Sequence, residues 1–290
     1  MEMITNVFLD VCMDTLKLLP FLFVTYLLME YFEEKAGDKM TAALEKTGKI
    51  GPLIGSLFGV IPQCGFSAAA ASFYSGGVIT AGTLLAVFLS TSDEMLPIFI
   101  SESVPGDTIA RILIMKVVMG AITGFVINFA LYALKRHRHS GHDIHDLCER
   151  EHCHCEDGEG GILKPALKHT FQITIFIFII TFAAALLVEG VGQERVAAVL
   201  TNRPIIGLFI ISLVGLIPNC ASSVLITQLY VGGLITAGQL MAGLLTGSGV
   251  GLLVLFRTND KYKSNLQLAF TLYAVGVIWG LLVTLMGITL

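Results

Sequence analysis

The chain has 290 residues, of which 54% are hydrophobic and 14% are charged, and its formal net charge is -4. Soluble domains carry about 25% charged residues, so this composition, with a mean hydropathy of +0.79, excludes an ordinary soluble domain. Because apolar runs of about 20 residues recur along the chain, we predict an all-α polytopic membrane protein. Its expected surroundings are a lipid bilayer, and we expect no nucleic-acid partner.

The first unit, residues 1–134, is expected to form helical segments. In chain order these are a span at 15–33, a polar stretch at 34–49, two short apolar pieces at 50–61 and 65–75, a segment at 78–99 and a last span at 111–134. Pieces of about 11–12 residues are too short to cross about 30 Å of hydrocarbon as ordinary helices. The short pieces are therefore expected to be half-helices, a re-entrant hairpin or short tilted spans.

A helix-breaking motif separates the two short pieces of the first unit. It reads Gly59-Val-Ile-Pro62-Gln63-Cys64-Gly65-Phe66-Ser67. Proline removes a backbone donor, and in lipid a broken helix survives only where it lines protein or water. We therefore predict that Pro62 is a structural break and that Gln63, Cys64 and Ser67 bind substrate.

Charged residues occur inside the last two segments of the first unit. Asp93 and Glu94 follow Ser92 within 78–99, and Lys116 lies in the last span. A charged group in a membrane span costs a few kcal/mol or more and is a functional candidate by default. We assign Asp93, Glu94 and Lys116 to coupling, Asp93 and Glu94 also to metal binding, and Ser92 to substrate binding. The alternative is that the carboxylates mark a helix end and that Lys116 snorkels to the interface.

A linker at 135–164 is rich in histidine and cysteine. Its candidate metal ligands of low affinity are His137, His139, His142, His145, Cys148, His152, Cys153, His154 and Cys155. Such tracts bind soft and borderline divalent metals, although the cysteine spacing matches no ordered zinc module. A flexible capture or sensing loop is therefore predicted, and a solvated charged linker is the alternative.

The second unit, residues 165–290, repeats the first at an offset of 156 residues. Between Gly59 and Gly82, 12 of 24 positions are identical to those of 215–238. The second copy of the break reads Gly215-Leu-Ile-Pro218-Asn219-Cys220-Ala221-Ser222-Ser223. A repeat held in one register over this length predicts two copies of one structural unit.

The repeat extends the candidate site to the second unit. Pro218 is the second structural break, and Asn219, Cys220 and Ser223 join the predicted substrate-binding residues. Cys64 and Cys220 are also candidate soft metal ligands. Ser248, which aligns with Ser92, completes the substrate-binding set, because small and polar residues at both positions predict a second interruption in each unit. The alternative is that these cysteines and serines are small buried residues that ease helix packing.

The basic residues of the short loops predict that the two units are inverted. They are concentrated at 34–49 in the first unit and at 256–265 in the second, whereas the loops at 100–110 and 190–205 carry fewer. Since basic loops face the cytoplasm, corresponding loops of the two units are expected on opposite sides. We predict two inverted repeats of about five helical segments each, with broken helices meeting near the membrane midplane. The protein is expected in the cell (inner) membrane, with a cytoplasmic linker and both termini outside.

The motifs resemble those of a known family. The doubled Ile-Pro-Gln/Asn-Cys break, the following Tyr-x-Gly-Gly-x-Ile-Thr-Ala-Gly at Tyr74 and Tyr230, and the histidine-rich loop between two halves resemble ten-span heavy-metal exporters. These are related to arsenic efflux permeases and are often labelled manganese transporters. The resemblance covers essentially the whole chain and implies an integral membrane exporter of a metal or metalloid ion.

The function that follows is secondary-active export by alternating access at the paired Pro-x-Cys breaks. The cargo is a manganese-like divalent cation or an arsenite-like species, since thiols suit the latter and carboxylates the former. Protons are candidate coupling ions, no cofactor is required, and no enzyme activity is expected. Transport of a sulfur-containing or organic anion is the main alternative. A membrane thiol oxidoreductase that uses Cys64 and Cys220 and a passive channel are weaker alternatives.

Overall fold

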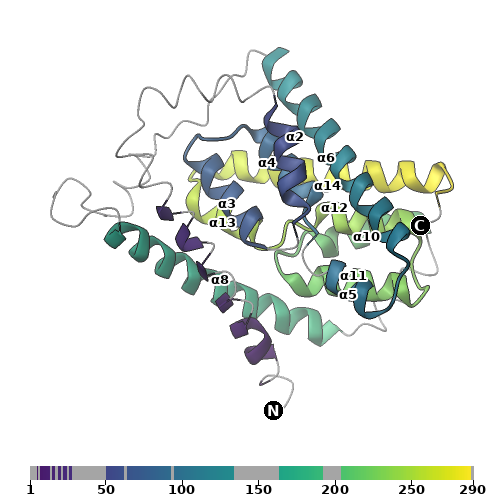
Figure 1. Ribbon diagram of the computed structural model, residues 1–290, viewed down its shortest axis with the longest axis horizontal. Helices are drawn as coiled ribbons and strands as arrows, with labels where there is room; N and C mark the ends of the chain where they lie inside the picture. The colour runs from purple at the N-terminus through teal and green to yellow at the C-terminus, as the bar shows by residue number, and fades with distance from the viewer. Residues whose placement is uncertain are drawn as a thin grey trace.

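The computed structural model describes residues 50–61, 64–92, 95–133, 163–191 and 204–288, together with helical turns within 5–27 (Figure 1). The described elements are all helices: α2 (Gly51–Gly59), α3 (Cys64–Ser75), α4 (Ala81–Ser90), α5 (Met95–Ser101), α6 (Gly106–Ala133), α8 (Leu163–Val191), α10 (Pro204–Gly215), α11 (Cys220–Val231), α12 (Ala237–Thr246), α13 (Gly251–Thr258) and α14 (Tyr262–Leu285). The prediction of an all-α protein is confirmed. Most of the predicted linker lies outside the described residues, so the division into units at 1–134, 135–164 and 165–290 stays a prediction.

Corresponding helices of the two halves have corresponding bounds. Helices α3 and α11 begin and end 156 residues apart, and so do α4 and α12. The N-termini of α4 and α12 show why these two helices begin at corresponding residues. Thr80 and Thr236 are N-caps with almost the same backbone angles, φ -79° and ψ 160° or 161°. Their hydroxyls accept hydrogen bonds from the backbone N–H of Thr83 and Gln239, which satisfies a donor that the first helical turn leaves free.

A helix interruption follows each of these two helices. Helix α4 ends at Ser90 and α5 begins at Met95, while α12 ends at Thr246 and α13 begins at Gly251. These are the places at which the small and polar residues predicted an interruption. The backbone groups at such helix ends lack partners within the helix, so they are free for other side chains or for a ligand.

Short helices of each half pack against short helices of the other half. Helix α3 packs against α13, and α11 packs against α5. Figure 1 shows these two pairs on opposite sides of the central helices α4 and α12. Each short helix that follows a Pro-x-Cys motif is therefore supported by the last short helix of the other half.

The two long helices α6 and α14 meet at a pair of equivalent residues. The indole Nε1 of Trp279 donates a hydrogen bond to Thr123 Oγ1 at 3.0 Å. These two residues are 156 positions apart, so each is the repeat mate of the other. A contact between mates is expected where two related halves meet around a twofold axis.

Glycines bring helix backbones into direct contact within each half. A Cβ atom at Gly82 would lie 2.3 Å from the carbonyl oxygen of Gly124, and one at Gly280 would lie 2.7 Å from that of Gly238. The first pair joins α4 to α6, and its mate joins α12 to α14. Small residues at such crossings allow close helix packing in a membrane, where no hydrophobic force drives helices together.

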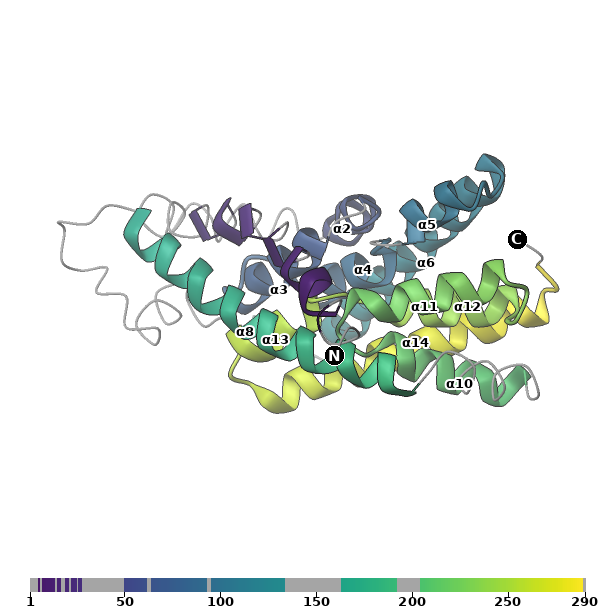
Figure 2. The same cartoon turned by 90° about the horizontal axis from the view of Figure 1, so that it is seen from below.

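The outer surface of the molecule is apolar. Helices α6, α8 and α14 expose large hydrophobic side chains, among them Phe129, Phe171 and Phe270. By length and composition, five helical stretches of the described chain could cross a membrane: Ala81–Ser101, Gly106–Ala133, Ala166–Ala183, Ala237–Thr258 and Tyr262–Leu285. In Figure 2 the helices of the first half lie mainly above those of the second. The chain is therefore a multi-pass membrane protein with its polar interruptions inside.

Candidate functional site

A small cavity of about 10 Å³ lies where the interruptions of the two halves approach each other. Its lining residues are Thr91, Ser92, Met95, Asn219, Ser222, Ser223, Leu244, Gly247 and Gly249. They belong to the α4–α5 interruption and the first residue of α5, the residues around the start of α11, the end of α12 and the α12–α13 interruption. The volume is close to that needed for one water molecule. Three of the predicted substrate-binding residues, Ser92, Asn219 and Ser223, thus share one cavity.

Hydrogen bonds fix the chain at the start of α11. Asn219 is buried, and its side-chain Nδ2 donates a long hydrogen bond of 3.5 Å to the carbonyl oxygen of Thr181 in α8. The hydroxyl of Ser222 donates to the carbonyl oxygen of Asn219 at 2.7 Å and to that of Ile217 at 3.2 Å. The half-buried Pro218 lies between these two acceptors in the sequence. The backbone carbonyls released at this turn are therefore satisfied locally, which holds Asn219 at the cavity.

The repeat mates Ser92 and Ser248 are equally buried but bonded differently. Each is 1% exposed. The hydroxyl of Ser92 donates to the carbonyl oxygen of Ser90 at 3.0 Å, whereas Ser248 Oγ has no partner within the described part of the chain. A buried hydroxyl without a partner costs about 1–3 kcal/mol, so it calls for an explanation such as a ligand or a water. The hydroxyl Oγ1 of Thr181, whose carbonyl oxygen accepts from Asn219, is likewise buried and has no hydrogen-bond partner among the described residues.

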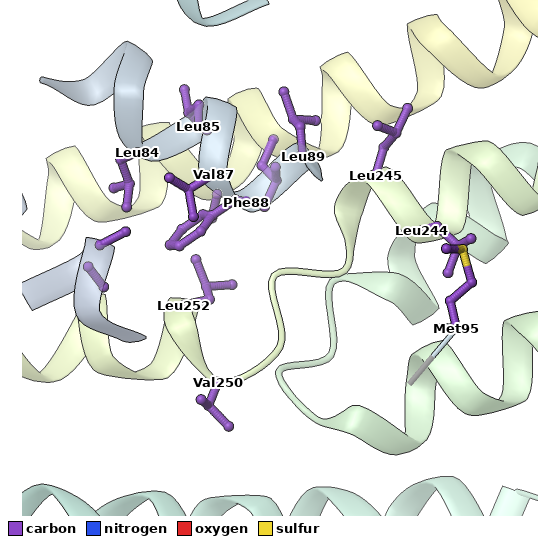
Figure 3. Packing of buried hydrophobic residues seen from close by; sticks show 14 of the residues in the cluster. Leu84, Leu85, Val87, Phe88, Leu89, Met95, Leu244, Leu245, Val250 and Leu252 are labelled. Atoms are coloured by element: carbon purple, nitrogen blue, oxygen red, sulfur yellow. The ribbon is translucent and has the colours of Figure 1, made fainter. Parts of the chain in front are cut away.

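The mates Ser67 and Ser223 lie at equivalent helix contacts. Ser67 is buried at the contact of α3 with α13, where a Cβ atom on Gly251 would lie 2.8 Å from Ser67 Cβ. In the other half, Ser223 lines the cavity together with Met95, the mate of Gly251. Figure 3 shows Met95 beside Leu244 and Phe88 beside Leu252, on the two sides of this region. The contact of α3 with α13 is therefore closely packed at Gly251, whereas the equivalent contact of α11 with α5 borders the cavity at Met95.

Among the described residues, the predicted coupling residue Lys116 lies next to the cavity. Its side chain is fully buried. The ammonium Nζ donates to the carbonyl oxygen of Thr91, and at 3.3 Å to that of Leu244. Both acceptors belong to cavity-lining residues. Complete burial inside the protein rules out the alternative in which Lys116 snorkels to the membrane interface.

Several predicted site residues lie outside the described part of the chain. These are Pro62, Gln63, Asp93, Glu94 and the histidines and cysteines of the linker. Cys64 and Cys220 are the first residues of α3 and α11, but their side chains also lie outside that part. Among the residues whose positions are described, no group of three His, Cys, Asp or Glu could hold a metal ion. The metal-ligand predictions therefore stay predictions.

The structure adds site residues that the sequence did not single out. Thr91 and Gly247 line the cavity and belong to segments that the sequence already predicted as helix interruptions, so the sequence did indicate this part of the site. A hydroxyl in an apolar span was a further signal for Thr181. Met95 and Leu244 carried none, because apolar residues of this kind are ordinary in a membrane helix.

One comparison with known proteins gives a match. A family model described as "Putative, 10TM heavy-metal exporter" matches residues 4–187. The match covers more than half of the chain and ends within α8. No curated protein and no solved structure matches the chain. Together with the apolar spans and the polar interruptions inside them, this match shows that the chain belongs to the family of 10TM heavy-metal exporters.

Proposed function

We propose that the protein is a secondary-active exporter that moves a metal or metalloid ion by alternating access at the cavity between the two halves. The observation that carries this proposal is the lining of that cavity. Interruptions of both halves contribute to it, and all of its polar side chains lie at helix breaks or beside them. In transporters built from inverted repeats, broken helices meet in this way around the substrate near the membrane midplane.

The proposal includes an inverted relation between the two repeats. The contact between the mates Thr123 and Trp279 and the exchanged pairs α3–α13 and α11–α5 support a twofold relation. If the twofold axis lies in the membrane plane, equivalent movements of the two halves open the cavity to opposite sides in turn. The proposed topology has both termini outside the cell (inner) membrane and the linker in the cytoplasm, where its histidines and cysteines would capture metal.

The proposed cargo is a thiophilic metal or metalloid species. Cys64 and Cys220 begin the two helices that follow the breaks, and the thioether residue Met95 lines the cavity. Soft sulfur ligands select soft ions, whereas manganese prefers carboxylate and carbonyl oxygen. Ser92 and Met95 both line the cavity, and Asp93 and Glu94 stand between them in the sequence. We assign these two carboxylates to proton coupling, and no bound cofactor is required.

Flux measurements on the purified protein in proteoliposomes test the proposal. We expect uptake of radiolabelled arsenite that is driven by a proton gradient and lost in the double variant Cys64→Ser/Cys220→Ser. Cys12→Ser is the matched control, because Cys12 lies near the N-terminus and lines no part of the cavity. If the protein transports manganese and does not transport arsenite, the carboxylates rather than the thiols bind the cargo. Unchanged arsenite flux in the double variant removes the thiol role, and a failure to move any metal or metalloid rejects the function.

The buried ammonium of Lys116 favours a second candidate function. When protonated, the Nζ of Lys116, which donates to the carbonyl oxygens of two cavity-lining residues, would attract an anion and repel a divalent cation. Transport of a sulfur-containing or organic anion is therefore the alternative. Counterflow of labelled anions in the same proteoliposomes separates it from metal export, because a metal exporter shows no such exchange.

A further inference from the structure

The ammonium of Lys116 lies between two helix ends that come from different halves. Thr91, whose carbonyl oxygen is one acceptor, is the C-cap of α4. Leu244, whose carbonyl oxygen is the other, lies in the last turn of α12, which ends at Thr246. Carbonyl groups in the last turn of a helix have no partner within it. Lys116 itself projects from a third helix, α6.

The C-terminal ends of two helices that direct carbonyl oxygens at the same position form a site for a cation. Each helix carries a partial negative charge at its C-terminus, and the carbonyl oxygens there are hard ligands. In transporters with interrupted helices, such carbonyl groups coordinate sodium ions or protons. Here the position is filled by an ammonium that the chain supplies itself and that brings one positive charge with up to three donors.

The arrangement is present on one side only. The repeat mate of Lys116 is Leu272, which is also fully buried. The second half thus places a hydrocarbon side chain where the first half places a charge. A buried charge is costly unless it is matched by polar partners, so a structural role in helix packing would be met equally well by leucine. The asymmetry points to a function that requires one cation per chain.

We propose that the Lys116 ammonium is a built-in substitute for a coupling alkali cation. Transport by this protein then needs no sodium or potassium, and removal of the ammonium converts the carbonyl pair into a binding site for such an ion. The inference rests on the proposed transport function, but binding of the ion is measurable without any cargo. Because the ammonium joins α4 to α12, it also positions the two cavity walls relative to each other.

The test compares Lys116→Ala with the wild type and with a matched variant in the other half. The purified full-length chain in nanodiscs is titrated with sodium, potassium or choline chloride at constant ionic strength, and thermal stability and binding of radiolabelled sodium are measured. The wild type should respond equally to all three salts and bind no sodium. Lys116→Ala should bind about one sodium or potassium ion per chain, and its Tm should rise with the logarithm of ion concentration above the Kd.

The matched variant is Leu272→Ala, which removes the fully buried side chain at the repeat mate of Lys116. It should be less stable than the wild type but equally so in every salt. Lys116→Met, which refills the space with an apolar chain, should bind no sodium either. If sodium stabilises Leu272→Ala as much as Lys116→Ala, the effect is not specific to this site and the inference is wrong.

Transport gives a second readout. Flux through the wild type should be the same in sodium and in choline, while Lys116→Ala should lose at least about tenfold in choline, or about 1.4 kcal/mol, and recover in sodium or potassium. Sodium dependence of the wild type overturns the inference. So does a Lys116→Ala protein that neither binds nor is stabilised by any alkali cation, including one that fails to assemble in all three salts. Sodium binding by the variant with no transport by the wild type would retain the cation site and reject the proposed export.

Discussion

The two halves of the molecule have the same scaffold and different chemistry. Caps, glycine crossings and interruptions recur at the same offset, because each is fixed by local geometry and close packing. Lys116, by contrast, has Leu272 as its mate, and the mates Ser92 and Ser248 differ in whether the hydroxyl has a hydrogen-bond partner in the described structure. The comparison indicates that the repeat builds the frame and supplies matched hydroxyl and thiol groups, whereas the buried lysine belongs to one half alone.

The largest expected effect comes from adding a second charge, in the other half. Leu272→Lys places an ammonium where the wild type has a fully buried leucine, and a buried charge without good partners costs several kcal/mol. We expect little folded protein by size-exclusion chromatography and a large loss of thermal stability.

The control for that variant is Leu285→Lys. Leu285 is 74% exposed and is the last residue of α14, so a lysine there reaches the interface at small cost. If Leu272→Lys folds as well as Leu285→Lys, the second half must also offer acceptors for an ammonium, and the asymmetry proposed here is wrong.

The glycine crossings should respond equally in the two halves. Gly124→Leu and Gly280→Leu each force a side chain into a backbone contact, and overpacking of this kind costs about 1–3 kcal/mol. Unfolding in mixed detergent micelles measures both variants.

Gly106→Ala is the matched control for the crossings, because a Cβ atom at this first residue of α6 would meet no atom within 4 Å. It should be neutral. A large difference between Gly124→Leu and Gly280→Leu would show that the two halves are not packed alike.

The serine mates should separate stability from transport. Ser92→Ala removes a hydrogen bond to the carbonyl oxygen of Ser90 and should cost about 0.5–1.5 kcal/mol. Ser248→Ala removes a buried hydroxyl that has no partner in the described structure, so stability should stay the same or rise while flux falls. Thermal melts and flux assays on both variants check this. A Ser248→Ala protein with wild-type flux would exclude Ser248 from the substrate site.

How far the sequence predicts the molecule depends on which force acts at each position. The interruption at Gly247 and the caps at Thr80 and Thr236 follow from local preferences, and repetition doubles the signal. Which breaks share a cavity depends on packing between residues far apart in the sequence. Local sequence patterns therefore do not predict that Asn219 and Ser92 line the same cavity. The burial of Lys116 was equally unpredictable, because its two carbonyl acceptors lie 25 and 128 residues away in the sequence.

The smallest effect is expected where each half turns into its last long helix. Ser103 precedes α6 with φ 55°, a left-handed conformation that disfavours any residue with a side chain. Its mate Asn259 has φ -109°, and its Nδ2 donates to Asn265 Oδ1 at 2.6 Å. Since glycine adopts positive φ without steric cost but loses more entropy on folding, Ser103→Gly should stabilise the protein by about 0.5 kcal/mol.

The same replacement in the second half should have the opposite sign. Asn259→Gly needs no left-handed backbone and loses the hydrogen bond to Asn265, so it should cost about 1 kcal/mol. Reversible unfolding in bicelles measures both variants. Equal effects would mean that the two corners are held by the same forces, whereas opposite signs would show that divergence between the halves extends from the cavity to the connections that support it.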